Sequence, residues 1–388
     1  MSIQQAIIGC DIFDGEKTHC NVALLYSGEA VSGIVSKTDI PAECNITELD
    51  GGLLAPGFVD LQVNGGGGVL LNEQPDVEGI RTICATHAQF GTTGMLPTLI
   101  TDRPEITTRA IQAGIEAHRQ SVPGFLGLHL EGPHLSIAKK GAHDPAFIRP
   151  MNDDDLKQLL DAAKSLPCLM ITIASESVRN EQIAQLAQAG IVVSLGHSNA
   201  SFQQANAAID AGAKCVTHLY NAMSPLGHQE PGMVGAALVR GEVYTGLIAD
   251  GHHVMPAAIK VALAAKNGPG EIFLVTDAMS TIGTELKSFT LNGRIILREC
   301  GRLVLEDGTL AGADLDMGSA VRFMHHTIDV SEIDALRMAS LYPAQCIGSA
   351  DNHGHLRAGA YANFIQFDGD LNINQVWQNG EKIKSGKF

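Results

Sequence analysis

Eight short apolar runs alternate with longer segments of helical spacing through the middle of the chain. The runs are Phe58–Asn64, Gly94–Ile100, Phe125–Glu131, Leu169–Ser175, Ile191–His197, Lys214–His218, Val243–Asp250 and Glu271–Asp277. The segment Asp102–Gln120, between two of these runs, has Pro104 near its start and apolar residues at helical spacing, which predicts a helix. Strands that alternate with helices form a parallel sheet, and eight such units predict a closed (β/α)8 TIM barrel in the α/β class.

The two ends of the chain have a different pattern. Up to about residue 54, short apolar runs are broken by turn signals such as Asp14-Gly15 and Asp50-Gly51. Near the other end, Tyr361–Phe367 is a strand candidate and Asn379-Gly380 is a hairpin-type turn. Both ends are therefore expected to form strands rather than strand–helix units.

Charge and cysteine spacing narrow the functional classes. The formal net charge is −16, which argues against nucleic acid or an anionic membrane as the main partner. The eight cysteines are widely spaced and include no C-x-x-C pair, so we expect them to be reduced thiols rather than a disulfide framework. We see neither a signal peptide nor an apolar run of about 18 residues, so we expect a cytoplasmic protein.

Polar side chains stand at the carboxyl ends of five of the eight runs. They are Gln62 and Asn64 on the first run, Glu131 on the third, His197 on the fifth, His218 on the sixth and Asp277 on the eighth. In a barrel of this type, the carboxyl ends of the strands converge on one mouth. The sequence therefore predicts a polar site at that mouth.

Glu131, His197 and His218 form a plausible metal site. One carboxylate and two neutral imidazoles suit Zn²⁺ or Fe²⁺ and leave a coordination position open. A single histidine at a strand end is more often a hydrogen-bonded structural residue. Two histidines on neighbouring strands, together with a glutamate at the same mouth, favour the metal site.

Two further residues have the chemistry of acid–base and electrostatic catalysis. Asp277 could serve as general base and then as general acid, although an aspartate here could instead cap a following helix. His143, in a long loop after the third run, could polarise a substrate carbonyl or could be a solvated loop residue. Of His252 and His253, which follow the seventh run, one is expected to reach the pocket.

Seven stretches, in this order, resemble the motifs of the amidohydrolase superfamily. They are Pro56–Asp60, His129–Pro133, Lys140–His143, Gly196–Ser198, Thr217–Met223, Asp250–His253 and Val275–Ala278. The resemblance covers almost the whole chain. It implies a barrel (residues 55–348) with a small β-sandwich domain formed from both chain termini (residues 1–54 and 349–388).

The resemblance is to superfamily members that hydrolyse the N-acetyl amide of a phosphorylated amino sugar. It implies that N-acetylglucosamine 6-phosphate is converted to glucosamine 6-phosphate and acetate. It also implies a homodimer whose site is completed across the interface. Alternatives are N-acetylgalactosamine 6-phosphate or another N-acyl amine as substrate, and a non-catalytic sugar-binding protein.

The resemblance also implies a role for each site residue. Glu131, His197 and His218 hold one divalent metal ion per subunit, which we expect to be Zn²⁺, with Fe²⁺ as the alternative. Asp277 is the acid–base group, and His143 polarises the acetyl carbonyl together with the metal. The expected substrate-binding residues are Gln62, Ala142, His143, Asn221, Ala222, Gln229, Asp250, His253, Leu310, Ala311 and Gly312.

Two positions depart from the pattern of the superfamily. Many members have H-x-H at the end of the first strand and bind a second metal there, whereas this chain has Gln62 and Asn64. Amides are poor ligands for a transition metal, so a single metal is expected. At Gln229 the related proteins usually have an arginine that reaches the substrate phosphate, and glutamine cannot supply that charge. His228, Lys139 or Lys140 could substitute for it.

Overall fold

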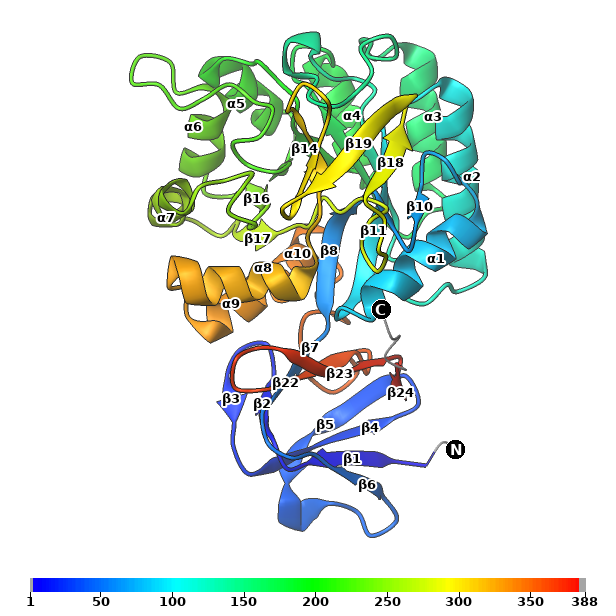
Figure 1. Cartoon of the computed structure of the whole chain (residues 1–388), viewed down its shortest axis with the longest axis vertical. Coiled ribbons are helices and arrows are strands. Elements are labelled where there is room, and N and C mark those ends of the chain that lie inside the picture. The colour runs from blue at the N-terminus through cyan, green and yellow to red at the C-terminus, as the bar shows by residue number, and fades with distance from the viewer. Residues whose placement is uncertain (1–2, 384–388) are drawn as a thin grey trace.

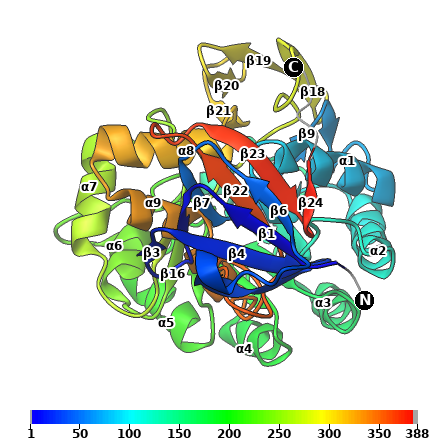
Figure 2. The ribbon, with the colours of Figure 1, turned by 90° about the horizontal axis from the view of Figure 1, so that it is seen from below.

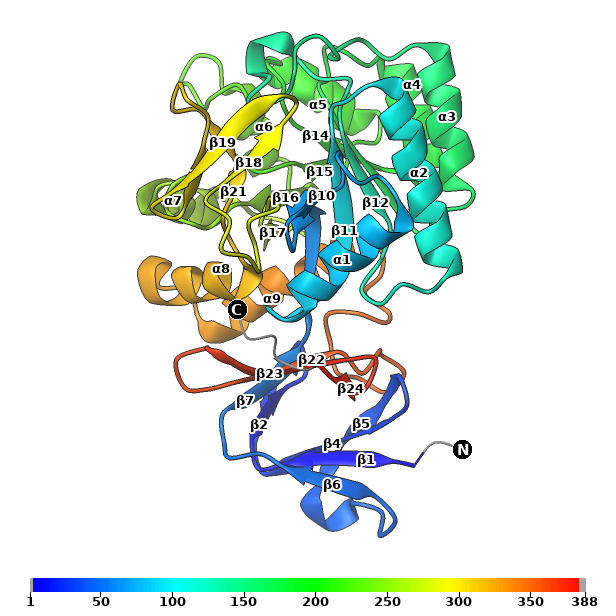
Figure 3. The same cartoon turned by 45° about the vertical axis from the view of Figure 1, so that its right-hand side comes forward.

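The computed structural model describes residues 3–383, and its centre is a barrel of eight parallel strands, seen in Figures 1 and 3. The strands are β8 (Phe58–Val63), β11 (Thr92–Ile100), β12 (Leu128–Glu131), β13 (Leu169–Ile173), β14 (Val192–Leu195), β15 (Cys215–Val216), β16 (Tyr244–Leu247) and β17 (Ile272–Leu274). They pair in sequence order, and Asp277 N–H donates to Gln62 O at 2.9 Å between the last strand and the first. The predicted TIM barrel is confirmed, with a strand at each of the eight runs.

Helices between the strands surround the barrel (Figure 1). The α-helices are α1 (Val77–Ala88), α2 (Pro104–Arg119), α3 (Asp153–Ala163), α4 (Asn180–Gln188), α5 (Phe202–Asp210), α6 (Gly232–Val239), α7 (Pro256–Ala265), α8 (Met317–Phe323), α9 (Glu332–Ala339) and α10 (Leu341–Cys346). The shorter helices are the 3-10 helices η1 (Lys37–Asp39) and η2 (Ile137–Lys139) and the π-helix η3 (Met324–Ile328). The helix expected over residues 102–120 is α2, which begins at Pro104. Proline is favourable at the first position of a helix, because the backbone N–H that it lacks would have no partner in the first turn.

Two sheets below the barrel are built from both ends of the chain, as Figure 2 shows from below. One sheet contains β1 (Gln5–Ile8), β4 (Val22–Ser27), β5 (Ala30–Ser36) and β6 (Asn45–Glu48). The other contains β2 (Asp11–Phe13), β3 (Thr18–His19), β7 (Leu53–Pro56), β22 (Phe364–Phe367), β23 (Ile373–Gln378) and β24 (Glu381–Lys382).

The two ends of the chain meet where β7 pairs antiparallel with β22. Buried side chains from both ends, among them Ile7, Leu54, Phe364 and Trp377, form one apolar cluster. The strand-rich ends therefore form the predicted β-sandwich. The domain boundaries stay a prediction, and the end of the second segment, residues 384–388, lies outside the described residues.

An inserted antiparallel sheet was not predicted. It follows β17 and contains β18 (Ser288–Leu291), β19 (Arg294–Glu299), β20 (Arg302–Val304) and β21 (Leu310–Ala313). Its apolar side packs on Leu70, Ile100 and Met279 near the mouth of the barrel. We call these four strands the mouth sheet; β18 and β19 are prominent in Figure 3.

Beside the barrel mouth, β9 (Gly65–Gly66) and β10 (Val69–Leu70) form a short hairpin. The four consecutive glycines Gly65–Gly68 make the tight turn of this hairpin, with positive φ at Gly67 and Gly68. Within residues 3–383, no helix combines the length and the apolar character needed to span a bilayer.

Candidate functional site

The backbone departs from regular strand geometry where the predicted site residues follow the barrel strands. His197, His218 and Asp277 have φ values of 46°, 29° and 52°. Positive φ is unfavourable for residues other than glycine, and such strain concentrates at functional sites. In a regular strand, consecutive side chains face opposite sides of the sheet. The positive φ at His218 and Asp277 breaks this alternation and allows both side chains to point into the mouth.

Glu131, His197 and His218 form a compact, buried cluster. Glu131 Oε1 lies 3.0 Å from His218 Nε2 and 3.3 Å from His197 Nε2, and the two Nε2 atoms are 3.1 Å apart. A tetrahedral zinc site with bonds of about 2.0–2.1 Å places its ligand atoms about 3.3 Å apart. Burial favours a neutral Glu131, but its side-chain contacts with the His197 and His218 imidazoles outweigh burial and hold the pKa of Glu131 well below the ordinary value.

The ring of His197 is oriented by the loop that follows β12. Its Nδ1 lies 2.8 Å from the backbone oxygen of Lys139. Because a carbonyl only accepts, Nδ1 carries the proton and the lone pair of the neutral ring is on Nε2. Metal-binding histidines are commonly oriented by such a partner. The donor set and its spacing therefore fit one divalent ion.

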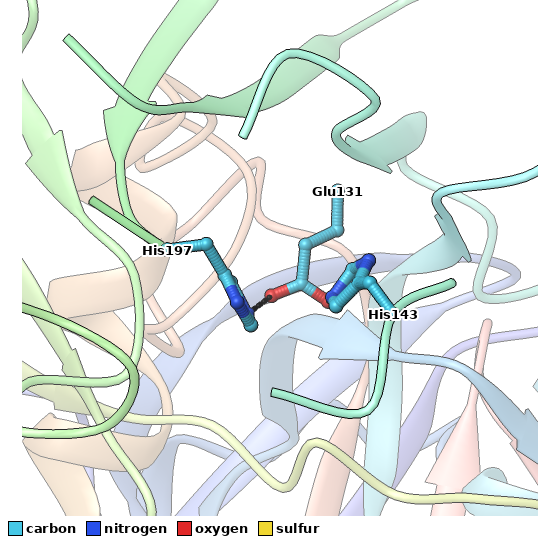
Figure 4. Close-up of side chains that lie close together, drawn as sticks. All are labelled: Glu131, His143 and His197. Carbon is cyan, nitrogen blue, oxygen red and sulfur yellow. Dashed lines mark ion pairs between the residues drawn. The ribbon is translucent and has the colours of Figure 1, made fainter. Parts of the chain in front are cut away.

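His143 lies on the other side of Glu131, as Figure 4 shows. One ligand atom from each of Glu131, His143 and His197 lies within 4.8 Å of the others, so proximity alone would also admit His143 as a metal ligand. However, the Thr101 N–H donates to His143 Nδ1 at 3.3 Å, so in the neutral ring Nε2 carries the proton. Burial lowers the pKa of His143 to about 3. His143 is therefore a neutral donor, with Nε2 at 3.7 Å from Glu131 Oε2.

Asp277 is held by the two amides that replace the H-x-H pair. Gln62 Nε2 and Asn64 Nδ2 donate to its Oδ1 at 3.2 and 2.6 Å, and Gln62 also donates to Glu131 Oε1 at 3.0 Å. These bonds leave Oδ2 available for proton transfer. Burial, reinforced by the negative charge of Glu131, raises the pKa of Asp277 to about 6.

His253 lines the pocket, whereas His252 is exposed. His253 Nδ1 lies 2.6 Å from Asp250 Oδ2, and Asp250 Oδ1 accepts from the backbone N–H groups of both histidines. Asp250 therefore orients the His253 ring from behind rather than lining the pocket itself. Of the two histidines, His253 is therefore the one that reaches the site.

A cavity of about 380 Å³ opens above these side chains. The predicted residues that line it are Glu131, Ala142, His143, His197, His218, Asn221, Ala222, His253, Asp277, Leu310, Ala311 and Gly312. Gln62 lies beneath it through its contacts to Glu131 and Asp277. Gln229 is exposed and is not among the lining residues of this single chain, so its role stays a prediction.

The mouth sheet supplies pocket residues that sequence reasoning missed. Leu291 and Thr309 line the cavity, and Arg294 donates to the backbone oxygen of Ala142. The missed signal was Asn292-Gly293, whose φ values of 49° and 74° form the turn between β18 and β19. Lys139, the one lysine or arginine among the lining residues of the described chain, was expected from the sequence as one of three groups that could substitute for the arginine missing at Gln229.

Comparisons with known proteins agree with this architecture. The family model described as "Amidohydrolase family" matches residues 53–385. An N-acetylgalactosamine-6-phosphate deacetylase of Shewanella sp. (strain ANA-3) is 42% identical, with 96% of this chain and 95% of that protein covered. An N-acetylglucosamine-6-phosphate deacetylase of Haemophilus influenzae is 35% identical, with 98% and 99% covered.

The solved structures include an N-acetylglucosamine-6-phosphate deacetylase from Pasteurella multocida. Its TM-score is 0.94 at 35% identity, with 98% of this chain and 99% of that chain covered. The match to the family model and these full-length similarities lead to one conclusion: the chain belongs to the amidohydrolase family.

Proposed function

We propose that the protein hydrolyses the N-acetyl group of N-acetylglucosamine 6-phosphate, giving glucosamine 6-phosphate and acetate, with one divalent metal ion per chain. The observation that carries this proposal is the buried Glu131, His197 and His218 cluster next to Asp277 and His143 in one cavity. The Haemophilus and Pasteurella relatives carry this activity in their names. The 42% identical Shewanella protein favours N-acetylgalactosamine 6-phosphate as a second candidate substrate.

Glu131, His197 and His218 would hold the ion, and two nitrogens with one carboxylate favour Zn²⁺, with Fe²⁺ as the alternative. When bound, such an ion supplies Lewis-acid chemistry, because it polarises a carbonyl group and makes water a stronger acid. Gln62 and Asn64 occupy the positions where a second ion would need imidazoles. Both amides donate hydrogen bonds to Asp277, which supports a single-metal site.

Asp277 and His143 would carry out the proton transfer and the charge stabilisation. Asp277 Oδ2 takes a proton from the water that attacks the acetyl carbonyl, and then donates it to the departing amine nitrogen. His143 Nε2–H donates a hydrogen bond to the carbonyl oxygen as negative charge develops there. Thr101 N–H supports this role because it keeps the His143 proton on Nε2.

The substrate is tested by measuring acetate release from four compounds: N-acetylglucosamine and N-acetylgalactosamine, each with and without a 6-phosphate. We expect the highest kcat/KM with N-acetylglucosamine 6-phosphate. A preference for the galacto compound would assign the second candidate substrate. No acetate from any of the four would contradict the deacetylase and favour another N-acyl amine or a non-catalytic sugar-binding protein.

The pH dependence of kcat/KM should show an ascending limb that belongs to Asp277. The base must be ionised, and its raised pKa of about 6 means that the ionised form is lost as the pH falls through that value. A bound cation next to Asp277 lowers this pKa, so the limb is expected at or below a pH of about 6. A pH–rate profile checks this, and an ascending limb centred well above pH 7 would contradict the assignment.

Lys139 is expected to bind the substrate phosphate. No other lysine or arginine lines the cavity in the described residues, and within residues 3–383 the Lys139 side chain forms no ion pair. Replacing Lys139 by Ala should raise KM for the phosphorylated substrate by about 10-fold or more, since a hydrogen bond to a charged group contributes about 1.5–3 kcal/mol. Steady-state kinetics with Lys140→Ala as the matched control would check this. An equal rise in KM for the unphosphorylated sugar would contradict phosphate recognition.

The proposed homodimer is supported by four exposed apolar side chains on one stretch of the chain. Leu226, Val239, Met255 and Val261 are 53–64% exposed, and they lie on the segment that includes α6 and α7. Exposed apolar surface, where it is contiguous, often marks an interface. Analytical ultracentrifugation should show a dimer, and a monomer at all working concentrations would contradict it. The cytoplasmic location stays a prediction.

A further inference from the structure

We propose that Thr217 is a positioning residue for His218, and that a buried chain of hydrogen bonds beneath the metal cluster holds the end of β15. This inference rests on the proposed role of His218 as a metal ligand. It explains what holds the His218 side chain in place relative to Glu131 and His197.

The need for such a device follows from the way each histidine is oriented. His197 is fixed by the Lys139 carbonyl, but His218 Nδ1 is buried and finds no hydrogen-bond partner in another described residue. The strand before His218 is also short: β15 has two residues, against four in β12 and β14. Apart from the contacts of its Nε2 within the cluster, the orientation of His218 therefore depends on the backbone at Thr217.

Thr217 joins three neighbouring strands through its side chain. Its Oγ1 lies 2.6 Å from Thr172 Oγ1 on β13 and 2.6 Å from Ser194 Oγ on β14. Thr172 Oγ1 lies 2.8 Å from His129 Nε2, and His129 Nδ1 lies 2.9 Å from the carbonyl oxygen of Leu61 on β8. These hydrogen bonds thus connect β8, through the Leu61 carbonyl, with β12, β13, β14 and the end of β15.

The direction of each hydrogen bond in this chain follows from the carbonyl at its end. Leu61 O can only accept, so His129 Nδ1 donates and Nε2 of the neutral ring accepts from Thr172. Thr172 then accepts from Thr217, and Thr217 accepts from Ser194. Each hydroxyl donates once along the chain, so removal of the Thr217 hydroxyl leaves two buried hydroxyls each short of one bond.

The consequence for the metal cluster is geometric. Thr217 precedes His218 directly, and His218 has the unfavourable φ of 29° that turns its ring toward Glu131. Without the hydroxyl contacts of Thr217, fewer contacts hold the end of β15, and the backbone at His218 can relax toward a more favourable φ. The His218 Nε2 would then move relative to Glu131 Oε1, which lies 3.0 Å away. Partners outside the ligands themselves typically contribute about 10–100-fold in metal affinity.

The experiment measures the Zn²⁺ dissociation constant of the metal-stripped full chain by competition with a chromophoric chelator. We expect Thr217→Val to weaken Zn²⁺ binding by about 10-fold or more. Thr217→Ser keeps the hydroxyl and should restore affinity to within about 3-fold of the wild type. The matched control is Thr245→Val on the next strand, because Thr245 Oγ1 is buried without a hydrogen-bond partner in the described structure. This control should bind Zn²⁺ as the wild type does.

Thermal unfolding of each metal-free variant separates affinity from stability. Wild-type affinity in a folded Thr217→Val would overturn the proposal, as would equal losses in Thr217→Val and Thr245→Val. Should Thr217→Val fail to fold, Ser194→Ala tests the same chain from its first donor. About a 3-fold loss of affinity would support the chain and no loss would overturn it. A wild-type protein that binds no divalent ion would instead contradict the proposed metal centre.

Discussion

Replacing Asp277 by Asn is expected to lower kcat by at least about 10²-fold, because general acid–base groups contribute about 10²–10⁴-fold. Asparagine keeps the shape of the side chain but cannot accept the proton of the attacking water. The two amides that donate to Asp277 Oδ1 can still donate to the amide oxygen of asparagine. The loss should therefore appear in kcat, while the metal content and the fold are retained.

Steady-state kinetics together with metal analysis and thermal unfolding check this prediction. Glu299→Gln is a suitable control, since it removes an exposed carboxylate on β19 outside the cavity and should leave turnover unchanged. Near-normal turnover in Asp277→Asn would contradict its role as the acid–base group. A loss of both metal and turnover would assign Asp277 to metal binding instead.

His197→Ala should abolish stoichiometric metal binding and, with it, most of the activity. The substitution removes one of three ligands whose donor atoms lie within 3.3 Å of each other. It also leaves the carbonyl of Lys139 without the donor that now contacts it. Metal analysis of the purified variant provides the measurement.

His118→Ala is the matched control, because His118 is exposed near the end of α2 and should keep the wild-type metal content. Added metal provides a second readout. A ligand at 100 times its dissociation constant stabilises a protein by about 2.7 kcal/mol, so Zn²⁺ should raise the unfolding temperature of the wild type but not of His197→Ala. Full metal content in His197→Ala would contradict the proposed ligand set.

The barrel was predictable because its strands are buried on both faces. Runs such as Leu169–Ser175 are mostly apolar, with Thr172 and Ser175 as the exceptions, and the helices between the runs are punctuated by proline and glycine. The C-terminal ends of those runs also pointed to the cluster, since parallel strands converge at one mouth. This is why Glu131, His197, His218 and Asp277 could be placed together from their positions alone.

The mouth sheet could not be recognised from apolar runs. Its strands are partly exposed, and β19 alternates buried and exposed positions around Ile296. They pack on the barrel mouth through scattered apolar side chains rather than through a continuous run. Leu310, Ala311 and Gly312 were therefore expected in the pocket only from the family resemblance, and the contact of Arg294 with Ala142 was not expected at all.

The hydroxyl chain under the cluster was also invisible in the sequence. Thr172 and Ser194 are ordinary strand residues and Thr217 directly follows β15, and only their distances show that they bond to one another. The tautomer of His143 likewise depends on a backbone N–H at Thr101, which is 42 positions away in the chain. Such links depend on register between strands, which a single sequence does not specify.

The central claim is that Glu131, His197 and His218 hold one divalent ion that the hydrolysis requires. The most direct measurement is metal content per chain, determined together with acetate release before and after chelation. The account predicts one ion per chain, loss of acetate release on chelation, and recovery when Zn²⁺ or Fe²⁺ is added back. Undiminished acetate release from protein without metal would contradict it.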